Sequence, residues 1–226
     1  MGRTQLFGGG STAREGERAI AEMFTGIVRG GARISSIVRE GDITHLKVTF
    51  PQGSLTGIEV GASIAINGCC LTVVSYSGQD AAFDLVPETI KRTTFRNSQQ
   101  EDSVHFERSL AFGDEVGGHL LAGHIDAVAE VVAVEELVGG RNVSFKLPAQ
   151  FIKYVLPKGY IAVMGASLTV VSVEQSKGVF SVSLIPETLR VTMFDRISVG
   201  DMVNIEIDRT TQAIVDTVER VLKDRR

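Results

Sequence analysis

Reactive side chains are few in this 226-residue sequence, and three of them are candidates for chemistry: Cys70, His124 and Ser167. An imidazole takes up and releases protons near neutral pH, and a thiol or hydroxyl can act as a nucleophile. His119 lies five positions before His124. On an extended strand these two side chains would face opposite sides, which makes a poor metal pair. We therefore expect proton transfer at His124 and no metal site; a hydrogen-bonded structural histidine is the alternative.

The elements that must position these residues come in two matched copies. The matched segments are Ile64–Ser75 with Ile161–Ser172, Leu85–Ile90 with Leu184–Leu189, and Val104–Glu107 with Val203–Glu206. An internal repeat of this kind predicts two copies of one fold, and hence a protein that handles two similar ligands or one ligand of pseudo-twofold character. The residues that differ between the copies should then carry the chemistry.

The differences between the copies include the reactive residues. Within the aligned triplets Gly26-Ile27-Val28 and Gly123-His124-Ile125, the histidine replaces an isoleucine. Cys70 is opposed by Ser167 in the same way, and Gly61 is opposed by Lys158. Two like ligands in unlike sites can play unlike roles, one giving a group and one receiving it.

Both copies also carry a Pro-Glu-Thr triplet directly after a predicted strand, at Pro87-Glu88-Thr89 and at Pro186-Glu187-Thr188. Proline fixes a turn there and leaves backbone amides and carbonyls exposed, which suits the edge of a planar heterocycle. The alternative is that the glutamate and threonine only cap the turn.

Composition limits the class of protein. A hydrophobic content of 43% and a charged content of 22% are typical of a globular chain, and no run approaches the roughly 18 apolar residues of a membrane-spanning helix. The net charge of −4 without basic clusters argues against a nucleic-acid partner. Cys69 and Cys70 are adjacent, which disfavours a disulfide and favours reduced thiols in the cytoplasm. Residues 1–22 are expected to form a disordered extension, although an organellar transit peptide stays open.

Short β-rich runs separated by turn residues predict an all-β fold. Six short strands in each half favour two tandem six-stranded antiparallel barrels, over residues 23–118 and 119–208, because closure leaves no exposed edges. We expect a Greek-key strand order, although the strand pattern alone does not give it. The expected strands are Thr44–Phe50, Ser63–Ile66, Leu71–Ser75, Ala82–Leu85, Ser103–Glu107, Ile125–Val134, Val143–Leu147, Tyr160–Val163, Leu168–Val173, Val179–Leu184 and Met202–Ile207.

The last segment, residues 209–226, has the periodicity of a helix instead. Ile214, Val218, Val221 and Leu222 share one stripe, and Thr210 or Thr211 is a candidate cap. This C-terminal α-helix either packs on the second barrel or serves self-association.

Several motifs together make the chain resemble the riboflavin synthase family from Met23 to the C-terminal helix. They are Met23-Phe24-Thr25-Gly26-Ile27-Val28, Asn67-Gly68-Cys69-Cys70-Leu71-Thr72-Val73, Gly117-Gly118-His119-Leu120, Gly123-His124-Ile125, Ser167-Leu168-Thr169-Val170, both Pro-Glu-Thr triplets, and the tail around Val203–Asp208 and Ala213–Arg220.

The resemblance implies a homotrimer gathered by the C-terminal helix, with the two ligands lying between the first barrel of one subunit and the second barrel of its neighbour. It implies a cofactor-free dismutation of two 6,7-dimethyl-8-ribityllumazine molecules to riboflavin and 5-amino-6-ribitylaminopyrimidinedione. Association with lumazine synthase stays open. A non-catalytic lumazine carrier of the same fold, such as the optical proteins of luminous bacteria, is the competing class.

The site residues implied by the resemblance divide between the barrels. The first pocket would use Gly26, Ile27, Val28, Ser63, Cys70, Leu71, Thr72, Asp84, Leu85, Val86, Pro87, Glu88 and Thr89. The second would use Gly123, His124, Ile125, Lys158, Ser167, Leu168, Thr169, Leu184, Ile185, Pro186, Glu187, Thr188 and Leu189. His124 would carry the proton of the lumazine C7-methyl group, Cys70 or Ser167 would add to the acceptor ring or orient a water, and Phe24 completes the catalytic set.

One position departs from the family pattern. Where the second barrel usually has aspartate before the glycine of the Gly-x-Ser-Leu-Thr segment, this chain has Met164, and the first barrel has Asn67. A thioether is a weak hydrogen-bond acceptor compared with a carboxylate. We therefore expect weaker catalysis or a locally altered pocket.

Overall fold

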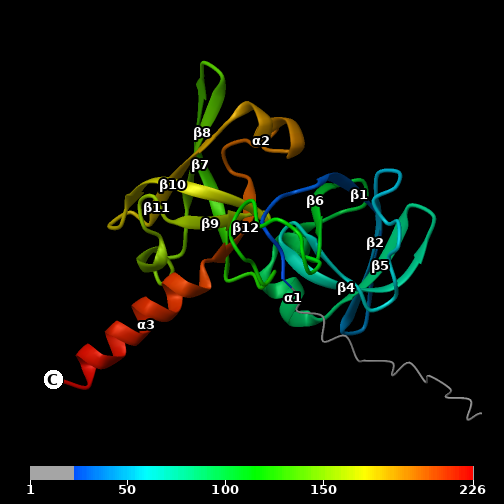
Figure 1. Cartoon of the computed structure of the whole chain (residues 1–226), viewed down its shortest axis with the longest axis horizontal. Coiled ribbons are helices and arrows are strands. Elements are labelled where there is room, and N and C mark those ends of the chain that lie inside the picture. Colours follow the sequence, from blue (N-terminus) through cyan, green and yellow to red (C-terminus); the bar gives the residue numbers. More distant parts are fainter. Residues whose placement is uncertain (1–22, 226) are drawn as a thin grey trace, which may run out of the picture.

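The computed structural model describes residues 23–225, which form two closed antiparallel barrels followed by a helix (Figure 1). The first barrel contains β1 (Gly30–Glu40), β2 (Ile43–Thr49), β3 (Ser63–Ile66), β4 (Cys69–Ser77), β5 (Asp80–Leu85) and β6 (Ser103–Arg108). The second contains β7 (Ala127–Leu137), β8 (Gly140–Lys146), β9 (Tyr160–Val163), β10 (Ala166–Glu174), β11 (Val179–Leu184) and β12 (Met202–Ile207). The 3-10 helices η1 (Thr94–Asn97) and η2 (Ile152–Tyr154) lie in connecting segments. The predicted all-β fold is confirmed.

The two barrels have the same strand order. The first runs β1-β2-β5-β4-β3-β6, and the second closes in the corresponding order around its own circle. In each barrel three consecutive hairpin strands are flanked by the sixth strand, which is a Greek key. Bulges at Ile34/Ser36 and Val131/Ala133 match between the barrels, and they increase the twist that closure requires.

Strand β1 is the element that the β-rich runs do not predict. Its first residues are Gly30 and Gly31, and Ser35 and Ser36 interrupt the apolar alternation. Ala32 and Ile34 are nevertheless buried, because pairing with β2 and β6 closes the barrel over them. A weak local pattern is here overridden by long-range pairing.

A local pseudo-twofold relation joins the barrels where Phe24 meets Leu121, two residues that the repeat aligns. Their backbones exchange two hydrogen bonds of 2.9 and 3.0 Å. The turns at Gly68 and Gly165, which the repeat also aligns, contact each other so closely that a Cβ on Gly68 would lie 2.6 Å from the backbone nitrogen of Gly165. The matched turns of the two copies therefore pack directly on one another.

The Pro-Glu-Thr triplets begin short helices, not the turns expected from the sequence. These are α1 (Pro87–Arg92) and α2 (Pro186–Val191), each with the proline in the first turn. Proline is well suited to this position because its fixed φ is helical and its missing N–H has no partner to lose. Glu88 and Glu187 are exposed and pair with Arg92 and Arg190 of their own helices.

The C-terminal helix α3 (Arg209–Lys223) begins two residues earlier than a cap at Thr210 requires. Its N-cap is Asp208, whose Oδ1 accepts a 2.7 Å hydrogen bond from the amide of Thr211, so the expected cap at Thr210 or Thr211 is wrong. The hydroxyl of Tyr154 donates to Asp216 at 2.6 Å, and Lys153 pairs with Glu219 at 2.6 Å. These contacts fix the middle of α3 on the second barrel.

The predicted apolar stripe of α3 lies on the exposed side of the helix. Ile214, Val218, Val221 and Leu222 are 59%, 51%, 43% and 57% exposed, and Figure 1 shows the helix running away from the barrels. Within residues 23–225, no helix is long and apolar enough to cross a membrane.

Candidate active site

Each barrel binds one glycine segment that the alignment of the two repeats assigns to the other barrel. The amide of Ser167 in β10 donates to the carbonyl of Gly26 at 2.9 Å, and the amide of Cys70 in β4 donates to the carbonyl of Gly123 at 2.8 Å. The expected grouping of Gly26 with Cys70 and of Gly123 with Ser167 is therefore wrong. Because the two segments cross between the barrels, the half-sites are Cys70 with Gly123-His124-Ile125, and Ser167 with Gly26-Ile27-Val28.

The apolar neighbours of the two glycines confirm this exchange. Val28 is buried in the hydrophobic core of the second barrel, and Ile125 packs against the core of the first. Gly26 and Gly123 have φ values of +75° and +73°, which favour glycine. A Cβ on Gly26 would lie 2.5 Å from Cβ of Ser167, and one on Gly123 would lie 2.6 Å from Cβ of Cys70. Only glycine fits these two contacts.

Two buried glutamates hold the crossing segments. Glu107 of β6 accepts hydrogen bonds from the amides of Thr25 (2.7 Å) and Gly26 (3.1 Å), and a third from the hydroxyl of Thr25. Glu206 of β12 accepts from the amides of Ala122 (2.8 Å) and Gly123 (3.0 Å). Each barrel thus holds one glycine by its amide, and the carbonyl of the same glycine binds the other barrel.

The two glutamates differ in how well their charge is compensated. Burial raises the pKa of both carboxyl groups, and it raises the pKa of Glu206 to about 7. Glu107 has the hydroxyl of Thr25 as an extra donor, whereas the matching residue in the second copy is Ala122. A buried carboxylate with fewer donors is easier to protonate, so the carboxyl group of Glu206 has the more strongly raised pKa of the two.

At the second barrel, Ser167 contacts a histidine that was not expected to take part. Nδ1 of His119 lies 2.7 Å from Oγ of Ser167, and the imidazole stacks on the ring of Tyr160 with 5.2 Å between centroids. Burial lowers the pKa of His119, so the ring is neutral at pH 7. Its Nε2 is buried and has no hydrogen-bond partner within residues 23–225. The pair is a hydroxyl beside a neutral base.

The spacing of the two histidines does not predict this contact. His119 lies in the segment that joins the barrels. That segment can pass close to Ser167 only because Gly118 has no side chain: a Cβ on Gly118 would lie 2.7 Å from Cβ of Ser167. The Gly117-Gly118-His119 run was the available signal, since adjacent glycines before a histidine indicate a close backbone approach.

At the first barrel, His124 and Cys70 share a half-site, because the carbonyl of Gly123 binds the amide of Cys70. The His124 ring is exposed, and its carbonyl accepts a 2.8 Å hydrogen bond from Arg209 at the start of α3. Arg209 also pairs with Asp126 at 2.9 Å, which ties this segment to the helix. The neighbouring thiol of Cys69 is buried, and burial raises its pKa to about 12, so it stays protonated.

The remaining predicted residues divide by exposure. Thr72 and Thr169 are exposed beside the buried Leu71 and Leu168, which alternate along β4 and β10. The exposed or partly exposed members of the predicted set also include Ile27, Val86, Lys158 and Ile185. The hydroxyl of Ser63 is buried without a partner in the described part of the chain. Phe24 is buried in a cluster with Ala65, Leu121 and Ala162, so it packs against the crossing segments.

Met164 takes the structural place of Asn67 in the second copy. Both residues have a positive φ, 49° and 48°. Oδ1 of Asn67 accepts the amide of His105 at 2.8 Å, and Sδ of Met164 accepts the amide of Asn204 at 3.2 Å. The methionine therefore fills a backbone-binding position between the barrels, and the weaker acceptor is the physical consequence of the departure.

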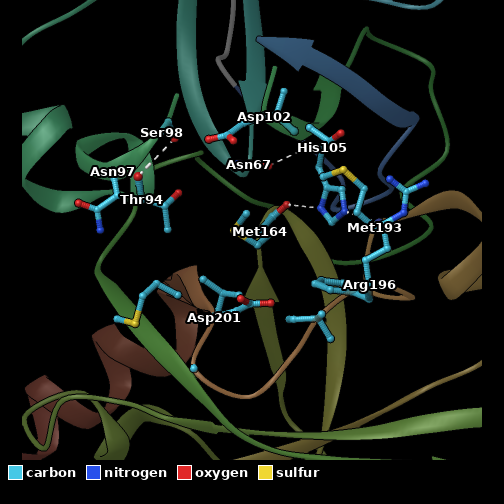
Figure 2. A pocket seen from close by; sticks show the side chains of 17 residues that line it. Asn67, Thr94, Asn97, Ser98, Asp102, His105, Met164, Met193, Arg196 and Asp201 are labelled. Atoms are coloured by element: carbon cyan, nitrogen blue, oxygen red, sulfur yellow. Dashed lines mark hydrogen bonds between the residues drawn. The ribbon is translucent and has the colours of Figure 1, made fainter. Parts of the chain in front are cut away.

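The two reactive half-sites lie outside the described cavities. Four cavities are described, and the largest, of about 650 Å³, lies between the barrels around Met164 and His105 (Figure 2). Neither Cys70 nor Ser167 lines any of these four. Among residues 23–225, no group of three or more His, Cys, Asp or Glu side chains is arranged to hold a metal ion. The arrangement therefore offers two matched half-sites for flat ligands, each with its own reactive residue.

Comparison with known proteins agrees with this duplicated arrangement. Residues 25–109 and 122–208 each match the family model of the lumazine binding domain. The chain is 46% identical over 204 residues to riboflavin synthase of Escherichia coli (strain K12), covering 90% of this chain and 95% of that protein. It is 38% identical over 200 residues to riboflavin synthase of Chlamydia pneumoniae, covering 88% of this chain and 97% of that protein.

A solved structure extends the likeness to the fold. LumP complexed with 6,7-dimethyl-8-(1'-D-ribityl) lumazine is similar with a TM-score of 0.74 and 28% identity, covering 82% of this chain and 99% of that one. Because the curated relatives are similar over nearly their whole length, the chain belongs to the riboflavin synthase family.

Proposed function

We propose that this chain catalyses the cofactor-free dismutation of two molecules of 6,7-dimethyl-8-ribityllumazine to riboflavin and 5-amino-6-ribitylaminopyrimidinedione. The observation that carries the proposal is that one architecture is used twice with different chemistry. The same backbone hydrogen bond joins Gly123 to Cys70 and Gly26 to Ser167. One half-site then presents a thiol and the exposed His124, and the other a hydroxyl bonded to His119.

The Ser167 half-site is suited to the acceptor molecule. Oγ of Ser167 adds to the electrophilic ring carbon while its proton passes to Nδ1 of His119. A C–O bond and an N–H bond form as the O–H bond and the C=N π bond of the ring break, and the π electron pair moves onto the ring nitrogen. The low pKa of His119 keeps the imidazole neutral, so it is free to take that proton. Elimination later returns the proton to the oxygen and frees Ser167 for the next turnover.

The Cys70 half-site is suited to the donor molecule. Its C7-methyl group must lose a proton before a carbon–carbon bond can form, and the exposed ring of His124 can reach a ligand lying on Cys70 and Thr72. Much of the acceleration would come from holding two rings in contact, which can lower such barriers by about 7–11 kcal/mol.

Two stacked ligands need a second protein surface that covers them. We place that cover on the neighbouring subunit of a homotrimer, with the first barrel of one chain facing the second barrel of the next. The exposed apolar stripe of α3 supports this assembly, since four large aliphatic side chains at 43–59% exposure would otherwise face water. Analytical ultracentrifugation should give a trimer for the whole chain and a monomer for a chain ending at Asp208; an unchanged mass would exclude α3 as the assembly element.

A non-catalytic carrier is the second candidate. It is favoured by the structural likeness to LumP and by Met164 at the position where the family usually has aspartate. Incubation of the purified protein with 6,7-dimethyl-8-ribityllumazine alone, followed by riboflavin absorbance, separates the two. One riboflavin for every two lumazines consumed supports the synthase, whereas tight binding without product supports the carrier.

A further inference from the structure

The largest described cavity lies between the barrels and has no part in the reaction above. We call it the seam cavity. Its lining includes Thr94, Asn97, Asp102, Met164, Arg196 and Asp201. Its volume of about 650 Å³ lies within the range of small-molecule sites. Figure 2 shows Thr94 and Asn97 on one side and Met193 and Arg196 on the other, with Met164 between them.

Methionine is concentrated in the seam cavity. Met164, Met193 and Met202 line it, and the chain has only five methionines in total. Thioethers are flexible and polarisable, and they make favourable contacts with aromatic rings. The three methionines are therefore suited to contact an aromatic ligand in this cavity.

Polar groups also line the cavity. The hydroxyl of Thr94 is buried and has no partner within residues 23–225, although Thr94 lines the cavity. Asp102 and Asp201 each accept one turn amide through Oδ2, from Gln99 and Ser198, which leaves their other oxygens for a ligand. Two carboxylates accept hydrogen bonds from hydroxyl groups and repel phosphate. Arg196 is the one arginine in the lining.

We propose that the seam cavity is a separate binding site for a planar aromatic heterocycle that carries a neutral, hydroxylated side chain. The ring lies against the three methionines, and the hydroxyl groups bind the carboxylates of Asp102 and Asp201. This site is independent of the Cys70 and Ser167 half-sites, since neither residue lines the cavity. The proposal does not depend on the catalytic function.

The test uses the whole chain labelled with ¹³C at the methionine methyl groups, with riboflavin as the probe. The methyl signals are assigned by single Met→Leu variants, and Met23 serves as an internal reference because it lies outside the cavity. We expect riboflavin to shift the signals of Met193, Met202 and Met164 in a saturable way and more than that of Met23. Three signals that stay in place at saturating riboflavin would overturn the proposal.

Two matched variants show where the ligand binds. Asn97→Trp fills the cavity from a side chain that has no described hydrogen bond, whereas Arg96→Trp places the same ring one position away, outside the lining. Asn97→Trp should abolish the methionine shifts while lumazine turnover persists, and Arg96→Trp should retain both. Shifts that survive Asn97→Trp would show that the ring binds elsewhere. Equal shifts with sucrose would remove the aromatic requirement and also overturn the proposal.

Discussion

His105 and Asn204 occupy matching positions of the two barrels, and each reaches across to hydrogen-bond the other barrel. Nδ1 of His105 donates to the carbonyl of Met164 at 3.0 Å, and its Nε2 accepts the amide of Met193 at 2.8 Å. Nδ2 of Asn204 donates to the carbonyl of Asn67 at 2.9 Å, and its Oδ1 accepts the amide of Thr94 at 2.8 Å. The partners are themselves matched residues of the repeat. A histidine and an asparagine thus perform the same two bonds across the seam.

The buried imidazole of His105 predicts a loss of stability in mild acid. Burial lowers the pKa of His105 from 6.5 to about 4. Between these values the unfolded chain binds a proton that the folded chain does not, so the free energy of unfolding should fall by up to a few kcal/mol as the pH falls through this window. Urea unfolding of wild type and of His105→Asn, measured from pH 7 to pH 4, checks this. An equal pH dependence in both proteins would contradict it.

Glu206 predicts the opposite dependence. Its pKa is raised from 4.5 to about 7, so the folded chain holds a proton that the unfolded chain has lost, and stability should fall as the pH rises from 4.5 to 7. Glu206→Gln removes this contribution, and the difference in unfolding free energy between variant and wild type should grow in favour of the variant as the pH rises. Glu107→Gln is the matched control, and it should lose more stability at every pH because it disturbs three hydrogen bonds.

The pairing of His119 with Ser167 predicts a defect in turnover. Removing the base with His119→Gln, or the hydroxyl with Ser167→Ala, should lower kcat by about 10²–10⁴-fold with a smaller change in KM. The double variant should lose little more than either single one, because the two residues act as a unit. Additive losses in steady-state kinetics would show that they act separately.

The close approach of Gly123 to Cys70 predicts a site-specific effect of one methyl group. Gly123→Ala puts a Cβ 2.6 Å from Cβ of Cys70, so the crossing segment must move and lumazine affinity should fall by about tenfold or more. Gly41→Ala is the control, because Gly41 also has a positive φ, +58°, but has no atom within 4 Å of its Cβ. It should cost only about 1 kcal/mol of stability. Equal losses of affinity in a fluorescence titration would attribute the effect to backbone strain alone.

The range of an interaction along the chain decides whether the sequence predicts it. Strands such as Ile43–Thr49 are predictable because burial alternates along a few neighbouring residues. The helix α3 is predictable from its period, but its cap at Asp208 was obscured by two threonines that follow. The repeat identifies Gly26 and Gly123 as equivalent, yet nothing local shows that each crosses to the other barrel. His119 meets Ser167 only through that crossing, and its role therefore required the structure.

Met164 gives the sharpest test of whether this chain has adapted to its departure from the family pattern. Its Sδ accepts the amide of Asn204 at 3.2 Å, in the place where Asn67 uses an amide oxygen at 2.8 Å. Oxygen is the stronger acceptor, so Met164→Asn should strengthen this bond and keep or raise both stability and turnover. Met164→Asp should do the same for turnover, because the carboxylate accepts a charge-assisted bond from the same amide. A large loss of turnover in both variants, measured as riboflavin formed, would show that the seam has been rebuilt around the thioether. A loss confined to the aspartate would instead locate the cost in burying a charge beside His105, a ring whose low pKa leaves it unable to neutralise that charge at pH 7.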